Sequence, residues 1–392
     1  MSLIKKNILF GILYTSFLAP FIFFMLGLPM ILQIQGFDAS LIGMFQMVGL
    51  PAVIKFLLSP PIDRFVFDKN HYKKWIMGIG ILYAFLLFGI SFFSLSDSFH
   101  LILALVMFTT LVSTFIDIPL NALSIKVFTQ KERISAGSYK ASSYFIAGVL
   151  GGGVFLLFYN HIGWRNTFMF MSLMVIASLF ILLFINENDE VTQNEKVSLK
   201  TIVSFFKQRD IGIWVFILSF YFAFISAVWI FLKPYLISKG ITPDDVAIYV
   251  GIYGSTVGFF GGIIASLIGK SFTKKTILMS FAIFAAISIL ILIYIEQTEL
   301  TISYLIVAVT LIALSIAFSS AIVFSLMMDY SRTESRGVDY AIQSSLFSFT
   351  RIISAVIAGV LVSNVGYYGM FLFEFVGLFI VVFVLYKFYK NR

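Results

Sequence analysis

Apolar stretches of about twenty residues follow one another along almost the whole chain, and they limit what it can fold into. Of the 392 residues, 60% are hydrophobic and 12% are charged, and phenylalanine alone contributes 47. A water-soluble globule of this length has too little interior to bury so much apolar surface. Because only helices and closed barrels satisfy their backbone in lipid, runs of this length predict an all-α membrane protein.

We expect twelve transmembrane helices joined by short connections. The predicted ranges are 8–33, 41–60, 75–95, 99–125, 135–159, 164–185, 211–238, 245–269, 276–295, 300–328, 337–363 and 367–387. The first range is longer than a signal peptide and has no small-residue cleavage site, so we interpret it as a span. A long polar connection at 187–210, interpreted as a solvated linker, separates a predicted six-helix bundle at 1–186 from a second one at 211–392.

Lysine and arginine gather on one side of the predicted helices. Of 27 such residues, 22 fall in the N-terminus, the C-terminus and the connections 61–74, 126–140, 186–210, 270–275 and 329–336, and three fall in the opposite connections. Positive residues mark the cytoplasmic side, so we expect both termini in the cytoplasm. This topology accounts for the net charge of +8 without a nucleic-acid partner.

The two halves of the chain share a pattern. The segment 163–170 opens the sixth predicted span and 366–373 opens the twelfth, both beginning with glycine, and the offset is 203 residues. The same offset superimposes Arg133 on Arg336, each at the entry to the next span. With a central linker, this pattern predicts two pseudo-symmetric six-helix bundles, an arrangement typical of carriers that expose a central site alternately to either side.

Four ionisable residues stand out inside the predicted spans, where a charge costs about 2.5–3.5 kcal/mol on insertion scales. They are Lys55, Asp117, Arg351 and Glu374, and Asn121 lies one helical turn beyond Asp117. We expect Asp117 either to carry a proton or to neutralise Lys55. Arg351 and Glu374 lie at similar depth and are a candidate structural ion pair. Alternatively, the forked guanidinium of Arg351 anchors an anionic group of the substrate.

Uncharged polar residues in the spans give weaker indications. Gln46, Gln343, Tyr221 and Trp229 are candidates for lining a substrate cavity, although such residues often only pack helices. The chain has no cysteine, and its three histidines are scattered. It contains no phosphate-binding loop, zinc signature or nucleophile elbow. We therefore expect no enzyme activity, cofactor or metal. We also expect the protein to be a monomer whose partners are a small-molecule substrate and protons.

The stretch 42–65, IGMFQMVGLPAVIKFLLSPPIDRF, resembles the second span and following connection of AmpG-like permeases of the major facilitator superfamily. The matching residues are Lys55, Phe56, Leu57, Pro60, Asp63 and Arg64, whereas Leu58 stands where the family usually has Trp. The resemblance implies that Asp63 and Arg64 form a cytoplasmic gating motif. Asp117 and Asn121 fall where the muropeptide branch has two acids, and 339–359 resembles the eleventh span, including Arg351.

The resemblance also suggests a cargo. The run 26–37, the pair Leu50 and Pro51, and the compact length look most similar to single-component siderophore permeases of the RhtX/FptX type. We therefore expect a secondary transporter that works by alternating access and imports a siderophore or similar iron chelate with protons. The alternatives are an AmpG-type muropeptide permease and, more remotely, a membrane sensor or enzyme.

Overall fold

The computed structural model describes residues 2–55, 58, 62, 65, 67, 69–93, 95–129, 132–187, 203–208, 211–268, 272–299, 301–332 and 336–389. In this part of the chain, nine helices are long and apolar enough to cross a membrane, which confirms an all-helical membrane fold. Two of the nine, Ser142–Phe184 and Val338–Phe388, are each interrupted by a glycine, and a shorter apolar helix covers Ala39–Val53. The predicted total of twelve is reached only if each interrupted helix counts as two spans and the shorter helix Ala39–Val53 counts as one.

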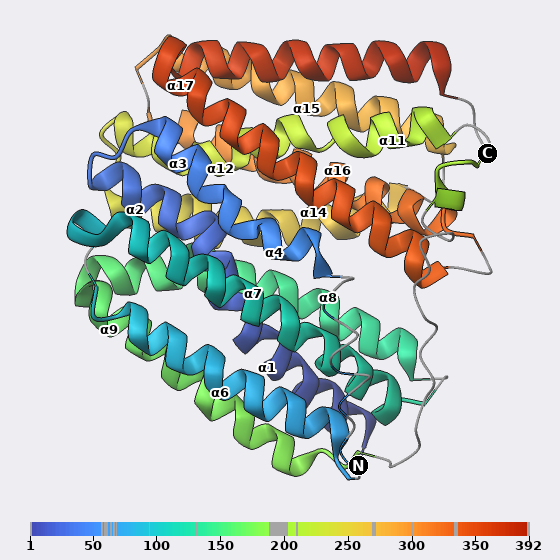
Figure 1. The fold of residues 1–392 in the computed structure, drawn as a ribbon. Helices are drawn as coiled ribbons and strands as arrows, with labels where there is room; N and C mark the ends of the chain where they lie inside the picture. The colour runs from blue at the N-terminus through green and yellow to red at the C-terminus, as the bar shows by residue number, and fades with distance from the viewer. Residues whose placement is uncertain are drawn as a thin grey trace. The chain divides into compact units, whose positions relative to one another are not determined.

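The chain forms two compact units, which are described separately. The first comprises Met1–Leu28 and Ile54–Glu195. Its helices are α1 (Leu3–Ile22), η1 (Phe23–Gly27), α6 (His71–Ile90), α7 (Leu95–Val127), α8 (Arg133–Val149), η4 (Leu150–Val154), α9 (Phe155–Leu179) and η5 (Phe180–Phe184). Within this unit α6 packs against α7 and α9, and α1 packs against α8 (Figure 1).

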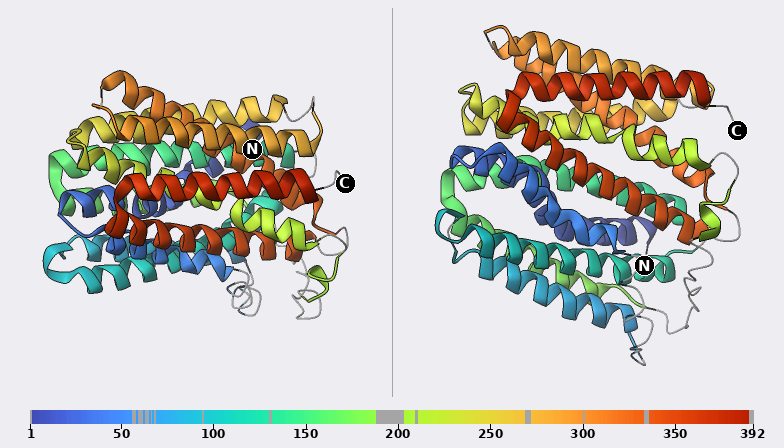
Figure 2. Two further views of the ribbon diagram at one scale, coloured as in Figure 1. Left: turned by 90° about the horizontal axis from the view of Figure 1, so that it is seen from above. Right: turned by 45° about the horizontal axis from the view of Figure 1, so that its top comes forward.

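The second unit comprises Pro29–Val53 and Lys196–Arg392. Its helices are α2 (Leu28–Ile34), α3 (Ala39–Phe45), η2 (Gln46–Gly49), α4 (Leu50–Val53), α11 (Ile211–Phe220), α12 (Ala223–Ser238), α13 (Pro243–Val246), η6 (Ala247–Gly254), α14 (Ser255–Ile268), α15 (Lys274–Glu296), α16 (Ile302–Asp329) and α17 (Arg336–Phe388). The helix α17 turns back on itself (Figure 2). Its first part packs against α3, and α17 also packs against α12 and α15.

The predicted repeat has a counterpart in the backbone. Gly163 in α9 has φ 78° and ψ 174°, and Gly366 in α17 has φ 72° and ψ 179°. Positive φ is readily adopted only by glycine, so each residue reverses the chain at the same point of its half. Gly36 and Gly240 also share positive φ, and each ends a helix through the same pair of backbone hydrogen bonds. The coincidence of both pairs favours the predicted pseudo-symmetry.

A lysine contact recurs in the two units. Lys73, at the start of α6, donates to the carbonyl oxygen of Ile185 at 2.7 Å. Lys275, at the start of α15, donates to the carbonyl oxygen of Tyr386 at 2.9 Å. In both units a lysine at the beginning of one helix thereby satisfies a carbonyl near the end of another, where helices leave such oxygens unpaired.

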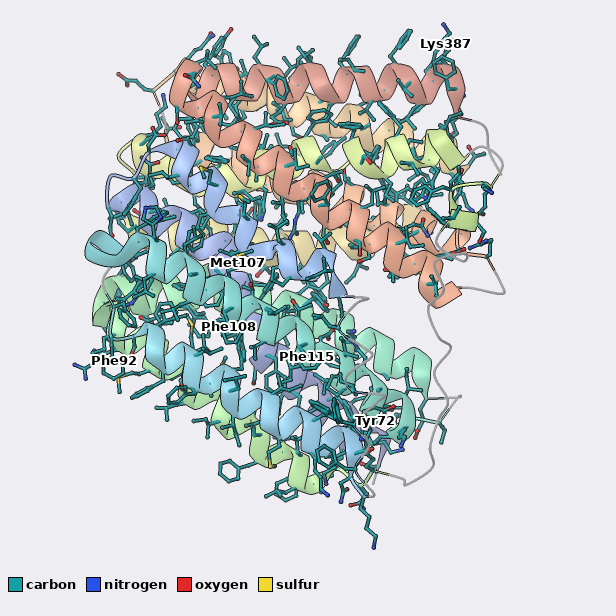
Figure 3. The ribbon with its side chains drawn as sticks, viewed as in Figure 1. Tyr72, Phe92, Met107, Phe108, Phe115 and Lys387 are labelled. Carbon is teal, nitrogen blue, oxygen red and sulfur yellow. The ribbon has the colours of Figure 1, made fainter. Side chains whose placement is uncertain are left out.

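The first described residue of the predicted linker is not solvated. The side chain of Glu187 is 1% exposed and lies 3.6 Å from the Lys126 ammonium. Its carboxylate also accepts the backbone N–H groups of Tyr72, labelled in Figure 3, and Lys73, both at 3.1 Å. Glu187 therefore caps the positive N-terminal end of α6. The linker residues 188–202 lie outside the described part of the chain.

Residues 29–53 belong to the second unit, whereas the prediction places them in the N-terminal bundle. The predicted domain boundaries otherwise remain a prediction. Within this segment, α3 packs closely against the first part of α17, because Gly43 and Gly359 face each other. A Cβ on Gly43 would lie 2.7 Å from the carbonyl oxygen of Ala355, and a Cβ on Gly359 would lie 2.5 Å from the carbonyl oxygen of Ala39. Small residues at such a crossing let two helix backbones approach each other.

We predict that Gly43→Ala lowers the free energy of unfolding by about 1–3 kcal/mol, because the added methyl group meets backbone atoms that cannot rotate away. Gly78→Ala is the matched control, since a Cβ there meets no atom within 4 Å. Thermal unfolding of both variants in the same detergent measures the difference. Equal unfolding temperatures for the two variants would show that the contact of α3 with α17 is not tight in the protein.

We predict that Asp38 stabilises the folded chain at neutral pH and that this stabilisation is lost in acid. Hydrogen bonds from Ser40 and then Ser363 hold the pKa of this exposed carboxyl below its usual value. Since the pKa is lower in the folded than in the unfolded chain, the stabilisation is present at neutral pH and is lost as the pH falls through the folded value. The unfolding temperature of Asp38→Asn should therefore lie below that of the wild type at pH 7 and approach it in acid. A difference that is independent of pH would contradict this assignment.

Candidate functional site

A charged pair lies at the centre of a polar cluster in the first unit. Asp117 projects from α7, and its carboxylate accepts a hydrogen bond from the ammonium of Lys55. The two side chains are 39% and 23% exposed for Lys55 and Asp117, respectively, so the pair is accessible rather than sealed in the protein. Charged groups avoid lipid, which favours a water-filled surrounding. The contact agrees with the interpretation in which Asp117 neutralises Lys55.

Asn121 connects this pair to further residues. It lies one turn beyond Asp117 on α7, and its amide nitrogen donates to the Asp117 carboxylate at 2.9 Å. Its amide oxygen accepts from the Tyr14 hydroxyl at 2.9 Å and from the Lys140 ammonium at 2.6 Å. The two bonds to the oxygen and the one to Asp117 fix the orientation of the amide. Asn121 is thus the junction of the cluster.

Two members of the cluster were missed by the sequence analysis. Lys140 was counted with the cytoplasmic connection at 126–140, which overlaps the predicted span 135–159; α8 begins at Arg133, which places Lys140 about 10 Å into the helix. The other is Tyr14 of α1, whose ring centroid lies 5.0 Å from the Lys140 nitrogen, close enough for a cation–π contact. The sequence did contain a signal for Lys140: the small residues Ser143, Ala147 and Gly151 follow it at helical spacing. In the structure all three are buried.

The cluster contains more positive than negative charge. Lys55 and Lys140 carry two cations, and Asp117 is the carboxylate between their contacts. Lys140 donates to a neutral amide oxygen, so the described contacts leave its charge without a carboxylate of its own. At short range and reduced dielectric, such an excess attracts anions. The arrangement is chemically suited to hold a carboxylate or another anionic group of a small solute.

The predicted ion pair of Arg351 and Glu374 is not formed in the second unit. Glu374 is fully buried, and neither of its oxygens accepts a hydrogen bond from the described part of the chain. Arg351 is half-buried in the first part of α17, and no ion pair or hydrogen bond joins its guanidinium to another described residue. The prediction matched only the depths of the two residues, and depth does not fix the direction in which a side chain leaves its helix.

The amide of Gln343 and the hydroxyl of Tyr221 are already engaged inside the second unit. The Gln343 oxygen accepts from the Trp214 indole at 2.6 Å, and its nitrogen contacts three oxygens at 3.0–3.1 Å. Tyr221 donates to the carbonyl oxygen of Leu278 at 2.9 Å. Both side chains are completely buried. These contacts give them structural roles and leave their predicted contact with a substrate without support.

The remaining candidates are Trp229, Gln46 and the predicted gating motif. Trp229 is half-buried on α12, and a Cβ on Gly254 would lie 2.8 Å from its ring. Gln46 is buried in η2 of the second unit. Asp63 and Arg64, the predicted gating motif, lie outside the residues that the structure describes. Substrate contacts by Trp229 and Gln46 stay predictions.

The chain is similar in sequence to bacterial transporters along nearly its whole length. "Putative transporter AmpG 4" of Rickettsia felis is 24% identical over 387 residues, covering 91% of this chain and 90% of that protein. "Putative transporter AmpG 3" of Rickettsia prowazekii is 23% identical and covers 99% of this chain and 97% of that protein. An uncharacterised protein of Haemophilus influenzae is 22% identical and covers 88% and 85%.

Solved structures share the fold at low sequence identity. A bacterial homologue of the human lysosomal transporter Spinster, in an inward-facing and occupied conformation, matches with a TM-score of 0.72 at 13% identity, over 98% of this chain and 95% of that one. A D-xylose–proton symporter matches at 0.71 and 12%, over 99% and 98%. A point mutant of the nucleoside transporter NupG matches at 0.74 and 13%, over 98% and 100%.

The sequence profile of the Major Facilitator Superfamily matches residues 8–355 and again 227–392. These matches and the all-helical fold support the predicted resemblance to AmpG-like transporters of the Major Facilitator Superfamily. The siderophore branch receives no support from them. The chain is therefore a multi-pass membrane protein, and it belongs to the Major Facilitator Superfamily as a secondary transporter.

Proposed function

We propose that this secondary transporter moves an anionic organic solute across the bacterial inner membrane by alternating access, and that uptake is coupled to protons. The observation that carries the proposal is the excess positive charge around Asn121. Lys140 lies in α8, two residues before the apolar span that begins at Ser142, and donates to an amide oxygen instead of a carboxylate. A bound anion would supply the missing negative charge.

The first candidate cargo is an anhydromuropeptide, the kind of solute that AmpG-type permeases carry. Such a molecule bears peptide carboxylates that suit an ammonium donor. The naming of relatives that cover at least 90% of this chain supports this candidate. A ferric siderophore or similar chelate is the second candidate, supported by the resemblance of residues 26–37. A chelate brings its own iron ligands, so the transporter needs only to recognise its charge and shape.

The inner-membrane location and the orientation of the termini belong to the same proposal. The relatives reported above are bacterial proteins. The concentration of 22 lysines and arginines on the side of the termini supports a cytoplasmic position for both ends.

We predict that Lys140→Gln weakens uptake of an anionic solute by raising its KM about tenfold or more, the usual effect of losing one charge-assisted hydrogen bond. Lys6→Gln is the matched control: Lys6 also contacts acceptors in the first unit, Glu132 and the carbonyl of Val127, but lies near the start of α1. Initial uptake rates into proteoliposomes over a range of solute concentrations measure both variants. Equal KM values would remove Lys140 from the binding site.

Uptake of radiolabelled anhydromuropeptide and of a radiolabelled ferric siderophore, measured in the same proteoliposomes, distinguishes the two candidate cargoes. We expect accumulation of the muropeptide when the outside is more acidic than the lumen, and abolition of that accumulation when a protonophore collapses the gradient. Accumulation of the siderophore alone would select the second candidate. Transport of neither anion would contradict the proposed substrate class.

A further inference from the structure

A buried carboxyl group in the second unit is not used by the site described above. Glu374 lies in the second part of α17 and has no exposed surface, and no residue that the structure describes forms a hydrogen bond with either of its oxygens. Phe371, Leu378, Val381 and Leu385 flank it at helical spacing and are also buried. Glu374 therefore belongs to the packed stripe of this helix and does not reach solvent at its edge.

The side of α17 that carries Glu374 packs on aromatic rings of α12. Phe373 lies 6.3 Å from the ring centroid of Phe224, and a Cβ on Gly377 would lie 2.4 Å from the same ring. One turn earlier, Phe371 lies 5.3 Å from the ring of Tyr235. These contacts on both sides place Glu374 opposite the segment of α12 between Phe224 and Tyr235. The surroundings are largely apolar, which is unfavourable for an unpaired carboxylate.

Charged and titratable groups on the neighbouring helices do not pair with it. On α12 they are Lys233 and Tyr235, and helical spacing puts Lys233 on the side away from the Phe224 and Tyr235 stripe. On α15 they lie near its two ends and are Lys274, Lys275, Tyr294 and Glu296. The α11 segment has none, and Arg351 on α17 itself forms no ion pair with Glu374.

Asp117 offers a direct contrast within the same chain. Its carboxylate accepts hydrogen bonds from the Lys55 ammonium and the Asn121 amide, and both donors favour the ionised form. Glu374 is buried more completely, and among the described residues none donates a hydrogen bond to it. An acid in that position is accommodated best with its own proton, because the neutral carboxylic group avoids the cost of an uncompensated charge in the interior.

We propose that Glu374 is a proton-binding site of the transporter, loaded with a proton in the arrangement described here. The proposal rests on the proton coupling put forward above and specifies which acid performs it. In this step the carboxylate takes up one proton and becomes a carboxylic acid, and the reverse step releases the same proton. Asp117 then acts as a fixed counter-charge for Lys55.

The transport test compares the wild type, Glu374→Gln and Glu374→Asp with Glu296→Gln in proteoliposomes. Glu296 is the matched control because it is an acid of the same unit with a lysine partner, Lys239, at 2.7 Å. The probe is whichever labelled anion the wild type accumulates in the cargo test. Glu374→Gln should lose accumulation driven by a pH gradient and keep exchange of labelled for unlabelled solute, whereas Glu374→Asp should recover part of the accumulation and Glu296→Gln should keep both activities.

A second readout does not depend on transport. Infrared difference spectroscopy of the purified protein detects the carbonyl stretching band of a protonated carboxylic acid. We expect a band that disappears in Glu374→Gln, persists in Glu296→Gln, and in the wild type is lost as the pH is raised. The absence of this band in the wild type, or a band that no pH removes, would overturn the assignment.

The two proposals can fail separately. If the wild type moves its solute without any response to a pH gradient, proton coupling is wrong, and the infrared titration still decides whether Glu374 binds a proton. If the wild type responds to the gradient and Glu374→Gln responds equally, coupling stands and Glu374 is not its site. Accumulation that requires sodium instead of a pH gradient would also overturn the assignment.

Discussion

The high cost of an unpaired charge or backbone group in lipid is the constraint on which this structure depends. It forces the chain into helices, because they satisfy their backbone internally. It also explains why Asn121 is held by three hydrogen bonds, and why the Lys55 ammonium meets the carboxylate of Asp117. Even at the helix ends, Lys73 and Lys275 reach back to carbonyl oxygens that would otherwise stay unpaired. Charged residues make up only 12% of the chain.

Glycine and proline set the points at which the helices depart from regular geometry. Gly163 and Gly366 reverse the chain with nearly identical backbone angles, although they lie 203 residues apart. Pro29 and Pro51 each follow an irregular turn, η1 and η2, and they lie close to the points where the chain passes between the two compact units. A proline cannot donate the backbone hydrogen bond that a regular helix requires, so these are places where the direction of a helix can change at low cost.

The sequence predicted the helices well because lipid exposure produces long apolar runs: the predicted range 276–295 lies within α15, which runs from Lys274 to Glu296. Local spacing also placed Asn121 beside Asp117, since both lie on one helix. Pairings between helices were harder, because they require the rotation of each helix as well as the depth of each residue. For that reason Arg351 and Glu374 were paired wrongly. Lys140 was missed because charge counting assigned it to a connection, although it lies about two turns inside α8.

The two transmembrane acids show how the same side-chain chemistry acquires different roles. Asp117 accepts hydrogen bonds from Lys55 and Asn121, and Asn121 is itself held by the hydroxyl of Tyr14. Glu374 is buried next to Phe373, whose ring packs on Phe224, and none of the described residues donates a hydrogen bond to it. A carboxylate with donors is a stable negative charge, whereas one without donors exchanges its charge for a proton. A carrier that binds an anion with one unit and a proton with the other would need this contrast, because a single acid cannot be both a permanent counter-charge and a reversible proton carrier.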